Sequence, residues 1–152
     1  MPDVRQDIRL RSATEVDLGR IHEIEVESFP DPWSRAGFRD LLSNSLARLE
    51  VAENEYGEVV GYAVALFMAD ESEIANLAVA AAARRLGIGA RLLDGLMATA
   101  RSFGTRSIFL EVRESNLAAR RLYASRAFEI MGRRTAYYRK PDEDAFIMRR
   151  TL

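Results

Sequence analysis

Apolar and polar residues alternate along this chain with two different periods, which divide it into expected strands and helices. A period of two, typical of half-buried strands, predicts a strand over residues 8–13. Further strands are expected over residues 47–55, 59–68, 71–79, 107–113, 128–139 and 144–152. Residues 108–113 are apolar on both alternating faces, as expected for a strand that is covered on each side. Apolar residues three or four positions apart, typical of amphipathic helices, predict helices over residues 14–29 and 34–44, from a glycine turn to about 104, and over 116–126. The order β-α-α-β-β-β-α-β-α-β-β indicates a mixed α/β domain whose helices pack on a central sheet.

Local signals mark the ends of these elements. Thr14, with Asp17 three residues later, resembles a helix N-cap. Pro30 and Pro32 exclude a continuous helix between the first two helical stretches. Tyr-Gly-Glu at 56–58 predicts a hairpin turn. No repeat, low-complexity segment or linker is visible, so we expect one domain over residues 1–152.

Composition excludes several classes of protein. With 152 residues and 48% hydrophobic content, the chain can bury a substantial core. No apolar run approaches the roughly 18–20 residues that span a bilayer, and the N-terminus lacks the apolar core of a signal peptide. The absence of cysteine excludes disulfides, thiol catalysis and zinc–thiolate sites. His22, the single histidine, lies in no metal-ligand pattern, and no basic stripe with interleaved aromatics indicates nucleic-acid binding. We therefore expect a cytoplasmic protein with no metal and no membrane or nucleic-acid partner.

Acidic residues gather ahead of the proline break. Glu23, Glu25 and Glu27 lie in the first predicted helix, and Asp31 follows in the loop that contains Trp33. A solvated helix face explains most of them. The alternative is that some attract a basic protein substrate, whose approach they would steer.

The turn between the fourth strand and the third helix carries two arginines and two glycines, in the order Arg84-Arg85-Leu86-Gly87-Ile88-Gly89-Ala90. The first amide N–H groups of a helix lack backbone partners and carry the positive end of the macrodipole. Glycines let such a backbone approach a ligand closely, which favours an anion such as a pyrophosphate. The turn matches neither a Rossmann fingerprint nor a P-loop, and taken alone it is equally well explained as a plain tight turn.

Three polar residues further along have both a structural and a chemical interpretation. Glu111 interrupts an apolar strand, where an isolated carboxylate is unfavourable. It is therefore either paired with Arg113 or another arginine, or it faces a water-filled cleft and acts as a general base. Tyr123 is either a packed aromatic residue or a proton donor to a leaving group. Asn116 is first a helix cap, although its amide could hold a ligand carbonyl.

Five segments in order resemble the GNAT acyltransferases, and most closely their RimI-type N-terminal alanine acetyltransferases, which modify a small-subunit ribosomal protein. They are FPDPWS, EIANLAV, RRLGIGARLL, LEVRESNLAARRLY and GRRTAYYRKPDEDAFIM. The similarity covers nearly the whole chain. The resemblance implies the GNAT fold, an α/β (α+β) architecture with a mixed, mostly antiparallel sheet of about seven strands and about four flanking helices.

The resemblance also implies roles for particular residues. Backbone groups of Leu77, Ala78 and Val79 would bind the pantetheine arm of acetyl-CoA, and Asn116 would also contact the coenzyme. The glycine turn would surround the pyrophosphate, and its residues are Arg84, Arg85, Leu86, Gly87, Ile88, Gly89 and Ala90. Glu111 would act as the base, and Tyr123 as the acid that protonates the departing thiolate. Trp33, Tyr137 and Tyr138 would form the groove for the acceptor peptide.

The implied reaction is transfer of an acetyl group from acetyl-CoA to the N-terminal α-amine, alanine being expected, of a protein such as a ribosomal protein, by a monomer or weak dimer. An α-amine titrates near 7.7–8.0, so its deprotonation near neutral pH costs roughly 1 kcal/mol or less, against about 4 for lysine. The alternatives are acetylation of a small amine or a lysine side chain, and a non-catalytic acetyl-CoA sensor. One departure from the family pattern is Ala127, which stands before Phe128 where a glycine is usual.

Overall fold

The computed structural model describes residues 7–152, so what we expect of residues 1–6 lies outside it. Seven strands in the described part form one sheet in the order β1-β2-β3-β4-β5-β7-β6. Their bounds are β1 (Arg9–Ser12), β2 (Ala47–Glu53), β3 (Val59–Met68), β4 (Glu71–Val79), β5 (Ser107–Arg113), β6 (Glu129–Tyr138) and β7 (Glu143–Thr151). The helices are α1 (Leu18–Ser28), α2 (Arg35–Leu42), α3 (Ile88–Ser102) and α4 (Leu117–Ser125). The element order is therefore the one that the hydrophobic pattern predicts.

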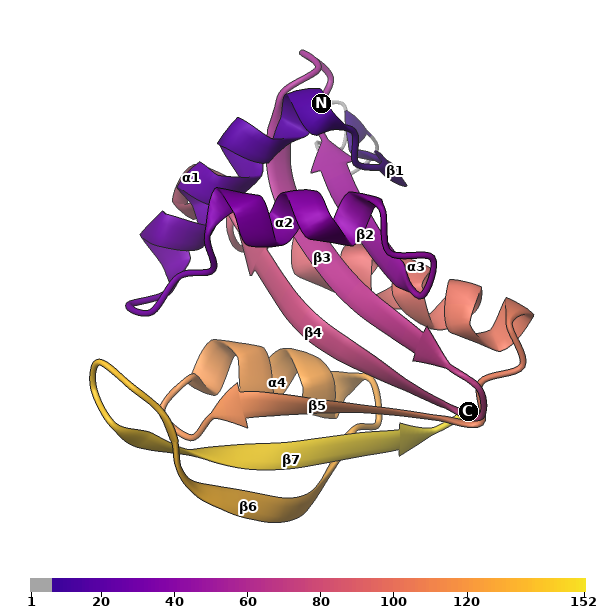
Figure 1. The fold of residues 1–152 in the computed structure, drawn as a ribbon, viewed down its shortest axis with the longest axis vertical. Helices are drawn as coiled ribbons and strands as arrows, with labels where there is room; N and C mark the ends of the chain where they lie inside the picture. Colours follow the sequence, from indigo (N-terminus) through magenta and orange to yellow (C-terminus); the bar gives the residue numbers. More distant parts are fainter. Residues whose placement is uncertain (1–6) are drawn as a thin grey trace.

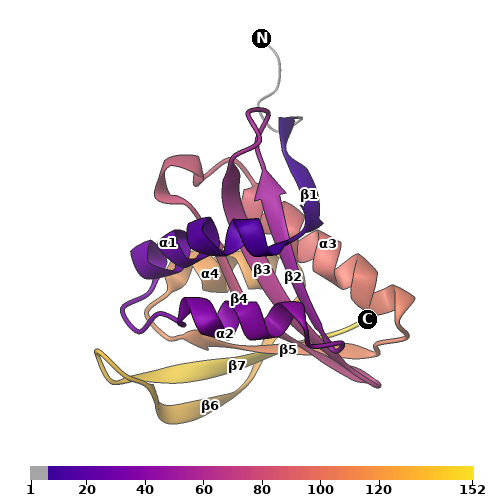
Figure 2. The same ribbon diagram turned by 45° about the horizontal axis from the view of Figure 1, so that its top comes forward.

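The sheet is mixed, as the resemblance implies. All neighbouring strands pair in antiparallel fashion except β4 and β5, which are parallel. This parallel pair requires a crossover, and α3 supplies it between the two strands. Figure 1 shows α1 and α2 over one face of the sheet and α3 behind the other, and the turned view agrees (Figure 2). The α/β architecture with seven strands and four helices is confirmed for the described residues.

The core lies mainly between α1, α3 and the central strands. The buried residues of α3 recur with the helical spacing of three and four, and they are Ile88, Leu92, Leu93, Leu96, Met97 and Ala100. This face packs on β3 and β4. No helix within residues 7–152 is long and apolar enough to cross a membrane.

The two halves of the sheet separate at the parallel pair. Pairing between β4 and β5 covers only Glu71–Ile74 with Ser107–Leu110. The register of β4 against β3 skips Ala75, because Val64 pairs with Asn76 and Ala65 pairs with Ile74. Such a bulge bends the strand that carries it. From this point β4 and β5 diverge, and Figure 1 shows β5, β7 and β6 leaning away from β4.

One expectation about β5 is only half right. We expect its apolar residues to be covered on both faces, but Ile108, Leu110 and Val112 are buried whereas the alternate residues are partly exposed. The strand lies beside the opening in the sheet, so one of its faces remains accessible there. Glu111 lies on that accessible face.

Candidate active site

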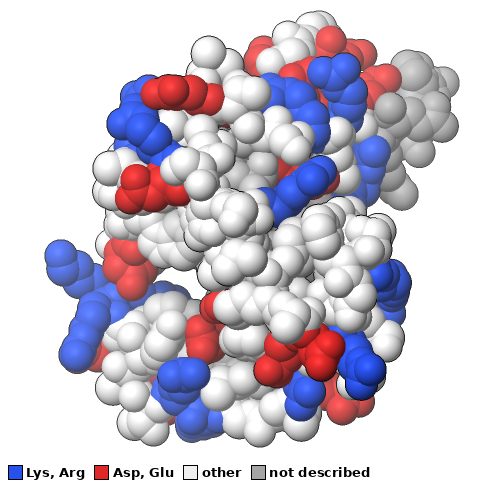
Figure 3. Space-filling view, turned by 45° about the vertical axis from the view of Figure 1, so that its right-hand side comes forward, with Lys and Arg blue, Asp and Glu red and all other residues white. Residues whose placement is uncertain are grey.

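A cleft of about 130 Å³ lies where β4 leaves β5. It draws its lining from α1, the loop before α2, β4, β5, α4 and the end of β6, including Glu25, Trp33, Asn76, Leu77, Glu111, Asn116, Tyr123 and Tyr138. In the space-filling view the outline is notched at the left, between the upper and lower parts of the molecule (Figure 3). The tertiary structure thus brings together most of the polar and aromatic residues singled out in the sequence.

Two side chains of β6 hold the carboxylate of Glu111. One carboxylate oxygen accepts from Arg134 Nε at 3.0 Å, and the other accepts from the hydroxyl of Tyr137 at 3.0 Å. The side chain is 12% exposed. The structural interpretation of Glu111 as an ion-paired carboxylate is therefore correct, yet the residue also borders the cleft.

Of the two alternatives for the partner of Glu111, Arg113 or another arginine, the second is observed, because Arg134 and not Arg113 pairs with it. The guanidinium of Arg113 instead forms ion pairs with Asp31 at 3.1 Å and Glu143 at 3.3 Å. It also lies 4.4 Å from the centre of the Tyr138 ring. Asp31 belongs to the loop before α2, whereas Glu143 and Tyr138 flank the β6–β7 turn. Arg113 therefore joins the two segments that border the cleft.

Tyr123 is fixed by the end of α4. The amide of Phe128 donates to the carbonyl of Tyr123 at 3.1 Å, and that of Ala127 donates to Ala124 at 3.1 Å, which together form a Schellman cap. The rings of Tyr123 and Phe128 pack edge to face, with centroids 5.8 Å apart. Burial raises the pKa of the Tyr123 phenol well above its ordinary value. The hydroxyl makes no hydrogen bond within residues 7–152, and the residue borders the cleft.

Asn116 caps α4, as its position at the helix start predicts. Its side-chain oxygen accepts from the amide of Ala119 at 3.1 Å. The residue also borders the cleft, so the capping interpretation and contact with a ligand are compatible.

The edge of β4 that faces the cleft carries Leu77, Ala78 and Val79. These residues pair with β3 on one side, while pairing with β5 ends earlier, at Ile74. Leu77 borders the cleft, and Ala78 is buried. A ligand can therefore pair with this edge as an additional strand would.

The glycine turn leads directly from β4 into α3. Gly87 is the N-cap residue of α3 and has a φ of +78°, in the left-handed region. It has no side chain that could accept a hydrogen bond from the first amide N–H groups of the helix. A Cβ at Gly89 would lie 3.3 Å from Leu122 of α4, so this glycine also permits close packing of the two helices. Arg85 has a left-handed φ of +66°. Ala90 lies in the first turn of α3.

Three side chains of the same turn have contacts outside the cleft. Arg84 donates to the Val79 carbonyl at 3.0 Å and to Ser28 at 3.3 Å, which ties the turn to α1. Leu86 and Ile88 line a second cavity of about 280 Å³ beside the β2–β3 hairpin. These three side chains are therefore engaged outside the cleft, whereas the backbone at Gly87 carries no side chain and has open space beside it.

Three aromatic residues border the entrance. The Trp33 ring packs on Phe38 with centroids 5.5 Å apart. Tyr137 and Tyr138 pack edge to face at 5.0 Å. Burial raises the pKa of Tyr138, and burial with the nearby Glu111 carboxylate raises the pKa of Tyr137. Trp33 and Tyr138 line the cleft itself, whereas Tyr137 contacts a cleft residue, because its hydroxyl donates to Glu111.

Glu25 is a cleft residue that the sequence interpretation missed. It is 1% exposed, so the expectation of a solvated helix face is wrong at this position. Burial raises the pKa of its carboxyl group. The spacing to Leu18 and Ile21, seven and four residues earlier, places it on the apolar side of α1 and is the signal that identifies it.

Its acidic neighbours also have partners. Glu27 accepts from the Ala81 amide at 2.6 Å, and Asp31 pairs with Arg113. In the described part of the chain, no three acidic, histidine or cysteine side chains gather as they would around a metal ion.

Comparisons with known proteins agree with this architecture. Residues 18–128 match the acetyltransferase (GNAT) family. A [ribosomal protein bS18]-alanine N-acetyltransferase of Haemophilus ducreyi is 34% identical over 143 residues, 91% of this chain and 97% of the relative. The ribosomal-protein-S18-alanine N-acetyltransferase of Escherichia coli superposes with a TM-score of 0.87 at 29% identity, covering 95% of this chain and 94% of that one. A phosphinothricin acetyltransferase of Sinorhizobium meliloti, solved with acetyl-CoA, superposes with a TM-score of 0.81 at 26% identity, covering 96% and 89%.

The chain belongs to the acetyltransferase (GNAT) family. The protein is an acetyl-CoA-dependent N-acetyltransferase.

Proposed function

We propose that this enzyme, as one domain over residues 1–152, acetylates the N-terminal α-amine of a protein, alanine being the expected first residue and a small-subunit ribosomal protein the expected acceptor. The observation that carries the proposal is the cleft where β4 leaves β5, because it places Glu111 and Tyr123 beside Trp33 and Tyr138. Relatives that match nearly the whole chain are named as alanine N-acetyltransferases of a ribosomal protein.

The described residues fit acetyl-CoA. The free edge of β4 at Leu77, Ala78 and Val79 offers backbone groups to the pantetheine amides. The α3 start at Gly87 offers uncapped amide N–H groups, which suit a pyrophosphate. Asn116 borders the same cleft. Bound there, acetyl-CoA supplies the acetyl thioester.

In this proposal the nitrogen of the α-amine forms a bond to the acetyl carbon, and Glu111 accepts a proton from that amine. Tyr123 donates its hydroxyl proton to the sulfur as the carbon–sulfur bond breaks. A tyrosine hydroxyl is protonated at neutral pH, so a proton is available to the leaving thiolate. Trp33, Tyr137 and Tyr138 hold the acceptor chain, and alignment of amine and thioester supplies much of the acceleration.

The decisive experiment measures CoA release with three acceptors: an Ala-starting peptide, its N-blocked lysine-containing counterpart and a small amine. We expect only the free α-amine to support turnover. Preference for lysine or for the small amine contradicts the proposed acceptor. No release with any acceptor, despite acetyl-CoA binding, identifies a sensor instead.

Glu111→Gln and Tyr123→Phe test the chemical roles. Each is expected to lower kcat about 100-fold or more, in the range for loss of general acid–base catalysis, while acetyl-CoA binding stays unchanged. The matched controls are Glu114→Gln, on the surface after β5, and Tyr56→Phe, 77% exposed at a hairpin tip. Full turnover in the two cleft variants removes Glu111 and Tyr123 from the mechanism.

A further inference from the structure

Glu25 is a buried carboxyl group in the cleft wall for which the proposed chemistry has no use. Its two oxygens accept from donors on three separate segments. Asn76 Nδ2 on β4 donates at 2.7 Å and the backbone amide of Trp33 donates at 3.1 Å. The hydroxyl of Tyr62 on β3 donates as well. Glu25 itself comes from α1.

Burial of a carboxyl group is unfavourable unless hydrogen bonds replace its hydration. An apolar side chain at the same place would satisfy packing without this cost. Three donors aimed at one carboxyl group from three segments instead fix those segments relative to one another, because each bond constrains distance and direction.

The segments joined in this way border the two halves of the cleft. Asn76 follows the Ala75 bulge at the free edge of β4, where we place the thioester, and its Oδ1 accepts from the amide of Leu77 at 3.1 Å. Trp33 lies in the loop that we place against the acceptor. The Trp33 ring packs on Phe38.

The aromatic packing continues to the same cluster. Phe38 packs edge to face on Tyr62 with centroids 5.4 Å apart, and the Tyr62 hydroxyl donates to Glu25. The Trp33 loop is therefore connected to Tyr62 of the sheet by two routes, from its backbone amide through Glu25 and from its ring through Phe38. The Asp31–Arg113 ion pair adds a separate link to β5.

We propose that Glu25 is a positioning residue that holds the Trp33 loop against the free edge of β4 and so sets the approach of the acceptor amine to the thioester. The inference rests on the proposed function for its kinetic consequence. Glu25 touches neither reacting group. Its loss loosens the loop while β4 stays paired with β3, so acceptor use suffers and acetyl-CoA binding does not.

Trp33 is the only tryptophan of the chain, so intrinsic fluorescence reports on this loop directly. In Glu25→Gln an amide NH₂ group replaces one acceptor oxygen. This NH₂ group faces hydrogen-bond donors, so at least one hydrogen bond to the side chain is lost. We expect acrylamide quenching of Trp33 to increase and KM for the Ala-starting peptide to rise about tenfold, the effect of about one lost charged hydrogen bond. The Kd for acetyl-CoA, from calorimetry, should stay within about twofold.

Two further variants complete the test. Glu23→Gln makes the same change on the same helix at a side chain that is 69% exposed, and it should leave all three quantities unchanged. Tyr62→Phe removes one donor and keeps the ring, and it should raise quenching and KM by a smaller factor. It provides the measurement if Glu25→Gln does not fold.

A folded Glu25→Gln protein with wild-type quenching and KM overturns the proposal. So does a parallel loss of acetyl-CoA and acceptor binding, which indicates a general structural role. If the wild-type enzyme acetylates no peptide, the proposed function fails, whereas the quenching comparison still decides whether Glu25 holds the loop.

Discussion

Ala127 shows how a single backbone angle supports the cleft. It lies in the left-handed region at φ +64°, where an L-residue other than glycine pays roughly 1–2 kcal/mol. The structure keeps this conformation because the cap at the end of α4 requires it. The departure from glycine noted in the sequence therefore preserves the turn at a cost in stability.

We predict that Ala127→Gly raises the free energy of unfolding by about 1 kcal/mol, because glycine adopts the left-handed conformation without strain. Part of this gain is offset by the greater conformational entropy that glycine gives the unfolded chain. Urea unfolding at pH 7 measures the net change. Ala124→Gly, inside the same helix, should lower stability by about 1 kcal/mol. A loss of stability in Ala127→Gly contradicts this account.

At this scale the sequence limits what each residue can do without choosing among the possibilities. From the sequence, Glu111 is either an ion-paired carboxylate or a general base in a cleft. In the structure it forms an ion pair and also borders the cleft. Arg113 is the nearest arginine in sequence, yet Arg134 is the partner. Glu111 and Arg113 share a face of β5, but Arg134 comes from β6, which β7 separates from β5 in the sheet. Spacing along one strand therefore cannot identify this partner.

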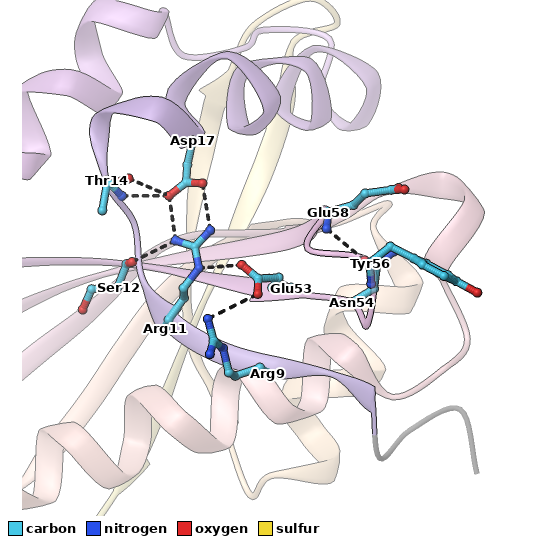
Figure 4. Close-up of polar contacts among 9 residues, drawn as sticks. All are labelled: Arg9, Arg11, Ser12, Thr14, Asp17, Glu53, Asn54, Tyr56 and Glu58. Atoms are coloured by element: carbon cyan, nitrogen blue, oxygen red, sulfur yellow. Dashed lines mark hydrogen bonds and ion pairs between the residues drawn. The ribbon is translucent and has the colours of Figure 1, made fainter. Parts of the chain in front are cut away.

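Among the elements, the start of α1 is tied to the sheet edge by an ion-pair network (Figure 4). Arg11 of β1 binds both carboxylate oxygens of Asp17, at 2.8 and 2.9 Å, and also Glu53 of β2 at 2.7 Å. Asp17 accepts from the Thr14 amide at 2.8 Å as well, which forms the capping box that the sequence predicts. This network holds α1 over the sheet on the side where the helix contributes Glu25.

We predict that Asp17→Asn lowers the free energy of unfolding by about 2 kcal/mol near pH 7, because a buried, bidentate charged pair is lost. The hydrogen bond from Arg11 lowers the pKa of Asp17 in the folded protein. Its contribution is therefore complete above the unfolded value of about 4 and disappears as the pH falls through the lowered folded value.

Urea unfolding of wild type and variant from pH 7 to pH 2 tests this sign. The gap between them should narrow below about pH 4. Asp142→Asn, at a side chain that is 67% exposed, serves as the control and should change stability little. A gap that persists unchanged to pH 2 is inconsistent with the ion pair as its cause.

Most elements were predictable, because hydrophobic periodicity is a local property. The bounds expected for β4 and β5, residues 71–79 and 107–113, are those observed. The exposure of β5 was not predictable from its own residues. Its accessible face depends on where β4 stops pairing with it, and that follows from the Ala75 bulge.

At the scale of the whole molecule, the opening between the two halves of the sheet predicts a global effect of acetyl-CoA. A ligand that contacts β4, α3 and α4 binds the folded state only, and at 100 times Kd it adds about 2.7 kcal/mol to the free energy of unfolding. For a chain of this size the midpoint of thermal unfolding should rise by about 5–10 °C. Unchanged unfolding at saturating acetyl-CoA contradicts the proposed binding mode.

Two glycines offer a matched pair for this measurement. Gly87 and Gly57 both have φ +78°, and a Cβ at either position meets nothing within 4 Å. Alanine at each should therefore cost the unliganded protein a similar amount, about 1 kcal/mol. Only Gly87→Ala should reduce the stabilisation by acetyl-CoA, because only that backbone is expected to approach the pyrophosphate. Equal shifts in both variants contradict the role of the turn.

The sequence alone determined the order of helices and strands, the helix caps at Thr14 and Asn116, and the family resemblance, since these depend on residues a few positions apart. The tertiary structure decided that Arg134 rather than Arg113 pairs with Glu111 and that Glu25 joins Tyr62, Asn76 and Trp33. It also decided where the sheet opens. Such contacts join residues far apart in the chain, and their geometry exists only once the strands have paired and the helices have packed.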